Sequence, residues 1–230
     1  MPVTAAHHAI LEALYSHLIG VNSWLNLTRL TTPAEYLKFH VFDSLTALGV
    51  VSDLSAPGDL CLDLGSGGGY PGLPLMTWLP DRHWVLVDSR GKKAAFLAEA
   101  VRLTPCRQAE AAAFRGREAA HARPDLARRC ALVTARAVGP ADEVLEEAEA
   151  LVRRGGFLLL LKGPSFVEQE RQAAVASAER LGFDMVQEMT MALDETDPER
   201  ILVLFERTEL PHGPGRPGRH HGGASRWPRR

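Results

Sequence analysis

The sequence predicts an α/β fold of the Rossmann-like type, with a mostly parallel seven-stranded sheet, an antiparallel last strand and a helical extension at the N-terminus. Three observations carry this prediction. Apolar residues recur at helical spacing in the first 55 residues, short apolar runs then alternate with amphipathic stretches, and two strand-like runs without a helix between them come last. Parallel neighbours need a crossover connection, which the amphipathic stretches supply as helices.

The N-terminal part, residues 1–55, is expected to form a helical cap. Between residues 4 and 20 the apolar side chains recur at helical spacing, at Ile10, Leu11, Leu14 and Leu18. A second helix is expected to start near Pro33, because proline is favoured in the first turn of a helix, where its missing N–H costs nothing.

The middle of the chain, residues 56–208, is expected to form the sheet and the helices that cover it. Apolar runs typical of buried strands lie at residues 60–64, 84–88, 132–136 and 157–161. Amphipathic stretches typical of helices lie at residues 74–79, 92–103, 141–151 and 166–181. A weakly marked third strand is expected near Ala109 and Glu110.

The C-terminal part contains two further strands and a polar tail. Residues 182–188 and 201–206 are separated by a polar segment without a convincing helix, which predicts an antiparallel pair. An antiparallel last strand is typical of methyltransferases that use S-adenosylmethionine (SAM). The tail, residues 209–230, is rich in Arg, Pro and Gly, and we expect it to be disordered. It is either a solubilising extension or a loose arm that binds RNA phosphates.

Composition bounds the class of protein and of partner. A formal net charge of −2 over 230 residues argues against a protein that coats nucleic acid through bulk charge, but it leaves room for a local basic face. No apolar run approaches the roughly 20 residues of a membrane span, so we expect a cytoplasmic protein with no membrane partner. The cysteines and histidines show no metal-site spacing, and no metal is expected. We also expect a monomer.

A glycine-rich loop follows the first strand of the predicted sheet. Residues 63–69 read Asp-Leu-Gly-Ser-Gly-Gly-Gly and precede a helix, which places bare backbone amides at a helix N-terminus above the carboxyl edge of the sheet. This edge is where α/β folds bind ligands. Gly65, Gly67 and Gly69 are therefore expected to contact a nucleotide-like cofactor.

Two carboxylates bear on the identity of that cofactor. Asp63 can pair, directly or through water, with the cationic amino group of SAM, whereas it would repel the pyrophosphate of a dinucleotide. Asp88 closes the second strand, where an acid accepts hydrogen bonds from ribose hydroxyls in both cofactor classes. SAM is therefore favoured. A nicotinamide-dependent oxidoreductase stays open, because residues 67–72 satisfy a loose dinucleotide pattern, as does a purely structural role in capping helices.

Together with its flanks, the loop forms a longer set of motifs. They are Asn26-Leu27-Thr28, His40-Val41-Phe42-Asp43-Ser44-Leu45, Asp63-Leu64-Gly65-Ser66-Gly67-Gly68-Gly69-Tyr70-Pro71-Gly72, Asp88-Ser89, Lys92-Lys93, Phe96-Leu97, Thr134-Ala135-Arg136-Ala137 and Leu161-Lys162-Gly163. Through them the chain, from about Asn22 to Glu206, resembles the bacterial 16S ribosomal RNA guanine-N7 methyltransferase family, also called the glucose-inhibited division protein B family. Phe39 and Ser66 stand where that family usually has a basic residue and a threonine.

The resemblance implies a SAM-dependent enzyme that methylates N7 of one specific guanine, with 16S ribosomal RNA or the small ribosomal subunit as partner. It implies cofactor contacts at Gly65, Tyr70, the Ala109-Glu110 pair and Arg136. Guanine N7 carries a free lone pair at neutral pH and needs no general base, and the sequence shows no obvious one. A methyltransferase for a small-molecule or protein acceptor is the alternative.

Polar residues outside the loop are candidates for holding the acceptor. His40 and Asp43 lie three apart on one helical face, and with Arg136, at the end of a strand, they are positioning candidates. The alternatives are an interhelical hydrogen bond for the first two and a surface ion pair for Arg136. The candidates for RNA contacts are Asn26, Arg29, Lys38, Lys92, Lys93 and Lys162.

Overall fold

A seven-stranded sheet forms the centre of the computed structural model, which describes residues 3–194, 197 and 199–208. The strands are β1 (Leu60–Leu64), β2 (His83–Val87), β3 (Ala109–Ala112), β4 (Cys130–Arg136), β5 (Val152–Lys162), β6 (Phe183–Met191) and β7 (Arg200–Arg207). Their order is β3-β2-β1-β4-β5-β7-β6, and β7 runs antiparallel to the other six strands. The predicted α/β class, the seven strands and the antiparallel last strand are confirmed. The predicted tail, residues 209–230, lies outside the described residues.

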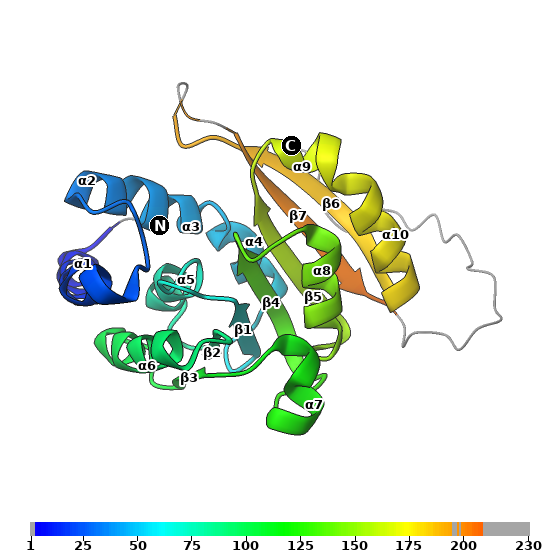
Figure 1. Cartoon of the computed structure of the whole chain (residues 1–230), viewed down its shortest axis with the longest axis horizontal. Coiled ribbons are helices and arrows are strands. Elements are labelled where there is room, and N and C mark those ends of the chain that lie inside the picture. Colours follow the sequence, from blue (N-terminus) through cyan, green and yellow to red (C-terminus); the bar gives the residue numbers. More distant parts are fainter. Residues whose placement is uncertain (1–2, 195–196, 198, 209–230) are drawn as a thin grey trace.

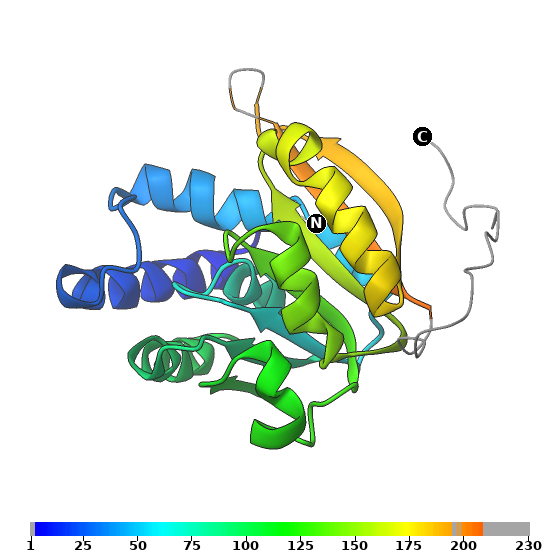
Figure 2. The same cartoon turned by 45° about the vertical axis from the view of Figure 1, so that its right-hand side comes forward.

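Helices cover both faces of this sheet (Figures 1 and 2). One face carries α1 (Ala5–Leu25), α2 (Pro33–Glu35), the π-helical segment η1 (Tyr36–Phe42), α3 (Asp43–Leu45), α4 (Leu48–Leu54), α5 (Gly72–Trp78) and α6 (Gly91–Ala100). The other face carries α7 (Ala119–Ala122), α8 (Ala141–Glu149), α9 (Ser165–Gln169) and α10 (Arg171–Leu181). The described residues also include two short 3-10 turns, η2 (Val101–Leu103) and η3 (Gly116–Glu118). No helix among the described residues is long and apolar enough to span a membrane.

The two faces of the sheet have separate hydrophobic cores, because alternate residues of a strand point to opposite faces. In β1, Cys61 packs into the core on the side of α1, whereas Leu62 and Leu64 pack into the core on the side of α8. Leu18 of α1 and Val51 of α4 are buried in the first core with α5 and α6. The N-terminal helices therefore pack against the same face as the helix that follows the glycine-rich loop. The division into a cap and a core at residue 55 stays a prediction.

The helix expected from Pro33 is present, but its geometry is not uniform. Thr32 caps it, since its hydroxyl accepts a hydrogen bond from the Glu35 amide at 3.3 Å. From Tyr36 to Phe42 the helix widens into a π-helical segment, a geometry that often marks functional sites. Here the widened turn lies against the end of β4, where the Phe39 carbonyl accepts a hydrogen bond from Arg136 at 2.9 Å.

The long helix expected over residues 166–181 is divided into α9 and α10 at Glu170. The Glu170 side chain accepts a hydrogen bond from the Ala141 amide at 2.7 Å, at the start of α8, and it also pairs with Lys162 at 2.6 Å. The backbone breaks helical geometry at Glu170, with a φ of −118°, while its side chain serves the neighbouring helix. Sequence periodicity could not show this break, because the apolar spacing continues across it.

Candidate functional site

The glycine-rich loop connects β1 to α5 at the carboxyl edge of the parallel strands. Its shape requires glycine at Gly65, where φ is +67° and a Cβ atom would lie 2.6 Å from Cγ2 of Val138. Gly72, the first residue of α5, is equally restricted, because a Cβ atom there would lie 2.9 Å from the Asp63 carboxylate. The loop is therefore packed tightly against both the end of β1 and the segment after β4.

Asp63 holds this loop from beneath. Its side chain is fully buried, and its two oxygens accept hydrogen bonds from the Gly72 amide at 3.1 Å and from the Thr134 hydroxyl at 2.9 Å. Burial raises the pKa of Asp63 to about 6, against the opposing effect of these donors. The carboxylate thus ties the loop to α5 and β4. The direct contact with SAM that the sequence suggests for Asp63 stays a prediction. The two hydrogen bonds support the alternative, a structural role in capping the helix that follows the loop.

Asp88 follows β2 and supports the loop from the side. Its carboxylate accepts hydrogen bonds from the Gly67 amide at 3.2 Å and from the Arg90 amide at 2.8 Å. A carboxylate offers about four lone-pair positions, so two backbone donors leave capacity for further hydroxyl donors. Asp88 is therefore placed both to shape the loop and to accept hydrogen bonds from a ligand lying on it.

Tyr70 joins the loop to the N-terminal helices. Its ring stacks on the His40 ring, with the centroids 4.4 Å apart and the planes at 11°, and the Arg136 guanidinium carbon lies 5.3 Å from the Tyr70 centroid. A cation this close to an aromatic face is attracted to the electron density of the ring. The stack brings residues from η1, the loop and β4 together.

His40 is neutral in this arrangement. Burial and the nearby Arg136 charge lower the pKa of His40 to about 4. Nδ1 lies 3.3 Å from Nη2 of Arg136, and Nε2 lies 2.8 Å from the Thr28 hydroxyl. Since a guanidinium can only donate, we assign Nδ1 as the acceptor and Nε2 as the atom that carries the proton and donates to Thr28. A histidine bonded in this way does not serve as a general base at neutral pH.

Asp43 binds two arginines. Its side chain is only 5% exposed, and its oxygens accept hydrogen bonds from Nη1 of Arg136 and Nε of Arg200. Sequence reasoning missed Arg200, which lies 157 positions further along the chain. A usable signal was present, because the first residue of an antiparallel last strand starts at the edge where the parallel strands end.

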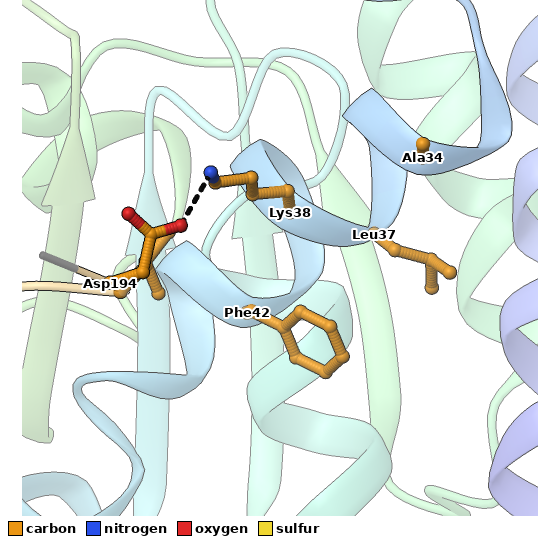
Figure 3. Close-up of a pocket in the computed structure, with 6 residues that line it drawn as sticks. Ala34, Leu37, Lys38, Phe42 and Asp194 are labelled. Carbon is orange, nitrogen blue, oxygen red and sulfur yellow. Dashed lines mark hydrogen bonds and ion pairs between the residues drawn. The ribbon is translucent and has the colours of Figure 1, made fainter. Parts of the chain in front are cut away.

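Two of the predicted RNA-binding lysines are engaged within the protein. Nζ of Lys38 lies 2.8 Å from Asp194 and 2.9 Å from Asp197, and Figure 3 shows Lys38 reaching toward Asp194. Both Lys38 and Asp194 line a surface pocket, together with Ala34, Leu37, Phe42 and Leu193. Nζ of Lys162 donates to Glu170 at 2.6 Å and to the Gly139 carbonyl at 2.7 Å, with the side chain 11% exposed. These contacts compete with any contact to phosphate.

The other candidates for RNA contacts lie at the surface. Arg29 and Lys92 are exposed, while Lys93 is half-buried and its Nζ lies 3.9 Å from the position of a Cβ atom at Gly67. Asn26 is exposed and ends α1 in the left-handed conformation. The turn that follows is held by Asn22, another residue the sequence reasoning did not select, whose carboxamide oxygen accepts hydrogen bonds from the Leu27 and Thr28 amides.

Ala109 and Glu110 are not brought to the loop. They pair with Trp84 and Val85 in the first half of β2, away from the carboxyl edge, and the Glu110 carboxylate binds Arg123 at 2.7 Å. The cofactor contact that the resemblance implies for this pair stays a prediction. Ala112, which ends β3, lies next to the carboxyl edge, where its carbonyl accepts a hydrogen bond from the Asp88 amide at 3.3 Å. Among the described residues, no group of three or more His, Cys, Asp or Glu could hold a metal ion.

Comparison with known proteins identifies relatives over most of the chain. Residues 7–197 match the model of a family described as rRNA small subunit methyltransferase G. A protein named ribosomal RNA small subunit methyltransferase G from Lactobacillus delbrueckii subsp. bulgaricus is 33% identical over 224 residues, which is 94% of this chain and 89% of the relative. The protein of the same name from Gloeobacter violaceus is 34% identical over 204 residues, 89% of this chain and 78% of the relative.

Solved structures with a similar fold are more distant in sequence. Geranyl diphosphate methyltransferase in complex with SAM has a TM-score of 0.57 at 12% identity, over 76% of this chain and 88% of that chain. TYW2 from M. jannaschii in complex with AdoMet has a TM-score of 0.54 at 13% identity, over 72% of this chain and 76% of that chain. At these identities the likeness shows a shared fold.

Proposed function

Because the chain belongs to the rRNA small subunit methyltransferase G family, we propose that it transfers a methyl group from SAM to N7 of one guanine in 16S ribosomal RNA. The observation that carries the choice of N7 is the network of His40, Asp43 and Arg136 beside the glycine-rich loop. Membership of a methyltransferase family argues against a nicotinamide-dependent oxidoreductase. We also propose that the protein is a cytoplasmic monomer and that its partner is 16S ribosomal RNA or the small ribosomal subunit.

The loop fits SAM as a cofactor. At Gly67 a Cβ atom would make only ordinary van der Waals contacts, 3.9 Å from the Gly65 carbonyl oxygen and from Nζ of Lys93, and Asp88 beside it has lone pairs left for ribose hydroxyls. SAM supplies an electrophilic methyl group when it is bound. The rigid loop orients the ligand, and the buried Asp63 maintains the shape of the loop.

The acid–base groups around the loop favour an acceptor that needs no deprotonation. His40 is neutral and bonded through both nitrogens, and the Asp43 carboxylate is bound by two guanidinium groups. The Asp63 carboxylate is fully buried. Guanine N7 carries its lone pair at neutral pH, so it requires alignment with the methyl group and exclusion of water, but no base. A ring N–H or hydroxyl acceptor would need a base that these three residues do not supply.

A methylation assay tests the proposal. Full-length protein, labelled SAM and small-subunit RNA or particles from a strain lacking this protein are combined, and the modified nucleotide is mapped. We expect label at N7 of a single guanine. Label at another atom would contradict the choice of N7, and SAM binding without label in any form of the RNA would redirect the proposal to a small-molecule or protein acceptor.

Exposed cations and cations paired within the protein are expected to respond differently to neutralisation. Arg29→Gln should weaken RNA binding and lower the slope of log K against log salt by about one, because an exposed phosphate contact is lost. Lys162→Gln should leave RNA affinity and its salt slope unchanged and lower the free energy of unfolding by about 1–3 kcal/mol, since it removes the charged partner of Glu170. Filter binding at several salt concentrations and urea denaturation check both. A lower salt slope for Lys162→Gln would assign that lysine to the RNA surface.

A further inference from the structure

Arg200 reaches the candidate site because β7 runs against the other strands. In the register of the sheet Arg136 pairs with Leu161, and Leu161 pairs with Leu202, so Arg136 and Leu202 lie at the same level two strands apart. Arg200, two residues before Leu202 and at the start of β7, therefore lies at the carboxyl edge, level with the loop that follows β4.

Asp43 links Arg200 to Arg136. One carboxylate oxygen accepts from Nη1 of Arg136 and the other from Nε of Arg200, and the carboxylate is almost completely buried. The last torsion of an aspartate is broad and roughly two-fold, so a single donor leaves the carboxylate plane free to turn. Donors on both oxygens fix that plane. A fixed carboxylate in turn restricts the guanidinium of Arg136, which also donates to the Phe39 carbonyl at 2.9 Å.

The buried network of Asp43, Arg136 and Arg200 carries a high free-energy cost for a purely structural contact. Taking charged groups out of water carries a large desolvation penalty, and well-packed apolar residues often give equal or greater stability in such places. Buried charge networks at the ligand edge of an α/β sheet are instead typical of functional sites. The Arg136 side chain is 16% exposed and lies over Tyr70 of the loop, so its orientation determines what it presents to a ligand.

We propose that Arg200 is a positioning residue for methyl transfer: through Asp43 it fixes the orientation in which the Arg136 guanidinium faces the Tyr70 ring beside the cofactor loop. The inference deepens the proposed function and rests on it. Arg200 is not assigned a contact with the cofactor or the RNA, and its effect is transmitted entirely by Arg136.

Three single variants test the role of Arg200. Arg200→Gln is expected to lower kcat/KM for methyl transfer on the order of 10-fold or more, because small displacements of a positioning group are costly. Arg200→Lys, which keeps a cation able to donate to Asp43, should recover a substantial part of that loss. The matched control is Arg171→Gln, which removes a half-exposed ion pair with Glu188 on the neighbouring strand β6 and should leave kcat/KM unchanged.

A double-mutant cycle with Arg136→Lys separates positioning from a general loss of stability. If Arg200 acts through Arg136, then Arg200→Gln causes little further loss once Arg136 is already changed. Losses in kcat/KM that multiply would overturn the proposal. So would a fall in Tm of Arg200→Gln together with full activity of that variant at a temperature where it is folded.

The same cycle distinguishes failure of this inference from failure of the proposed function. Wild-type protein is assayed for label at guanine N7 in the same series, and absence of that label contradicts the proposed function alone. In that case the cycle is measured by calorimetry of SAM binding, with the same four proteins. Non-additive changes in the SAM dissociation constant would still support coupling of Arg200 to Arg136, whereas additive changes would overturn it.

Discussion

Gly65→Ala is expected to weaken SAM binding strongly and to lower methyl transfer by about 100-fold or more. An alanine at a φ of +67° costs on the order of 1–3 kcal/mol, and its Cβ atom would lie 2.6 Å from Cγ2 of Val138. The loop must shift to relieve both, and a displacement of about 1 Å in a positioning element costs about 100-fold in rate. Calorimetry with SAM and the RNA methylation assay measure the two effects.

Two control variants divide the effect of Gly65→Ala into its causes. In the double variant Gly65→Ala/Val138→Ala the steric conflict is removed but the positive φ stays, so part of the SAM affinity should return. Gly49→Ala in α4 adds a methyl group where no atom lies within 4 Å, and it should leave SAM binding unchanged. Unchanged affinity in Gly65→Ala itself would show that the loop does not hold the cofactor.

The second large effect concerns the pH dependence of the free energy of unfolding, to which His40 and Asp63 are expected to contribute with opposite signs. The pKa of Asp63 is raised from its ordinary value of 3.8 to about 6, so the folded state binds an extra proton between those values. Its contribution to stability is present below about pH 3.8 and is lost as the pH rises through 6. The pKa of His40 is lowered from 6.5 to about 4, so its contribution is present above pH 6.5 and is lost as the pH falls through 4.

Between pH 4 and 6 the two slopes are each about 1.4 kcal/mol per pH unit, of opposite sign, and they nearly cancel in the wild-type protein. When one of the two groups is removed, the pH dependence contributed by the other is no longer cancelled. Relative to the wild type, Asp63→Asn should lose on the order of 2–3 kcal/mol of stability as the pH falls from 6 to 4, whereas His40→Asn should gain a similar amount over the same interval.

Urea denaturation of the three proteins across this range measures the effect. The difference between each variant and the wild type is the quantity to follow, because the titration of the other carboxylates is common to all three proteins. A constant difference for Asp63→Asn would mean that this carboxylate does not take up a proton near pH 6. A constant difference for His40→Asn would mean that the histidine titrates normally and is not held neutral by burial and Arg136.

Much of the fold followed from local patterns. The strand runs at residues 60–64, 84–88, 132–136 and 157–161 are all present, as is the helix that starts at Pro33. Apolar periodicity reports which face of an element is buried, and the glycine-rich loop reports where a backbone must take a left-handed conformation. These signals depend on near neighbours in the chain and need no knowledge of the tertiary structure.

The ends of helices and the registers of strands were harder to predict from the sequence. The long helix divides at Glu170, whose side chain is used by α8, and the short, alanine-rich β3 pairs with β2 so that Ala109 and Glu110 lie away from the carboxyl edge. In both places the deciding interaction lies outside the element itself. Local propensity contains no information about such partners.

The sequence by itself determined the class of fold, the position of the ligand edge and the residue types gathered there, because these depend on periodicity and on strand order. Only the tertiary structure decided which partners each charged side chain has. It showed that Lys38 and Lys162 are engaged by acids and that Arg200 joins Asp43 at the loop. The physical reason is that ion pairs and burial depend on contacts between residues far apart in the chain, whereas periodicity reports only the local face.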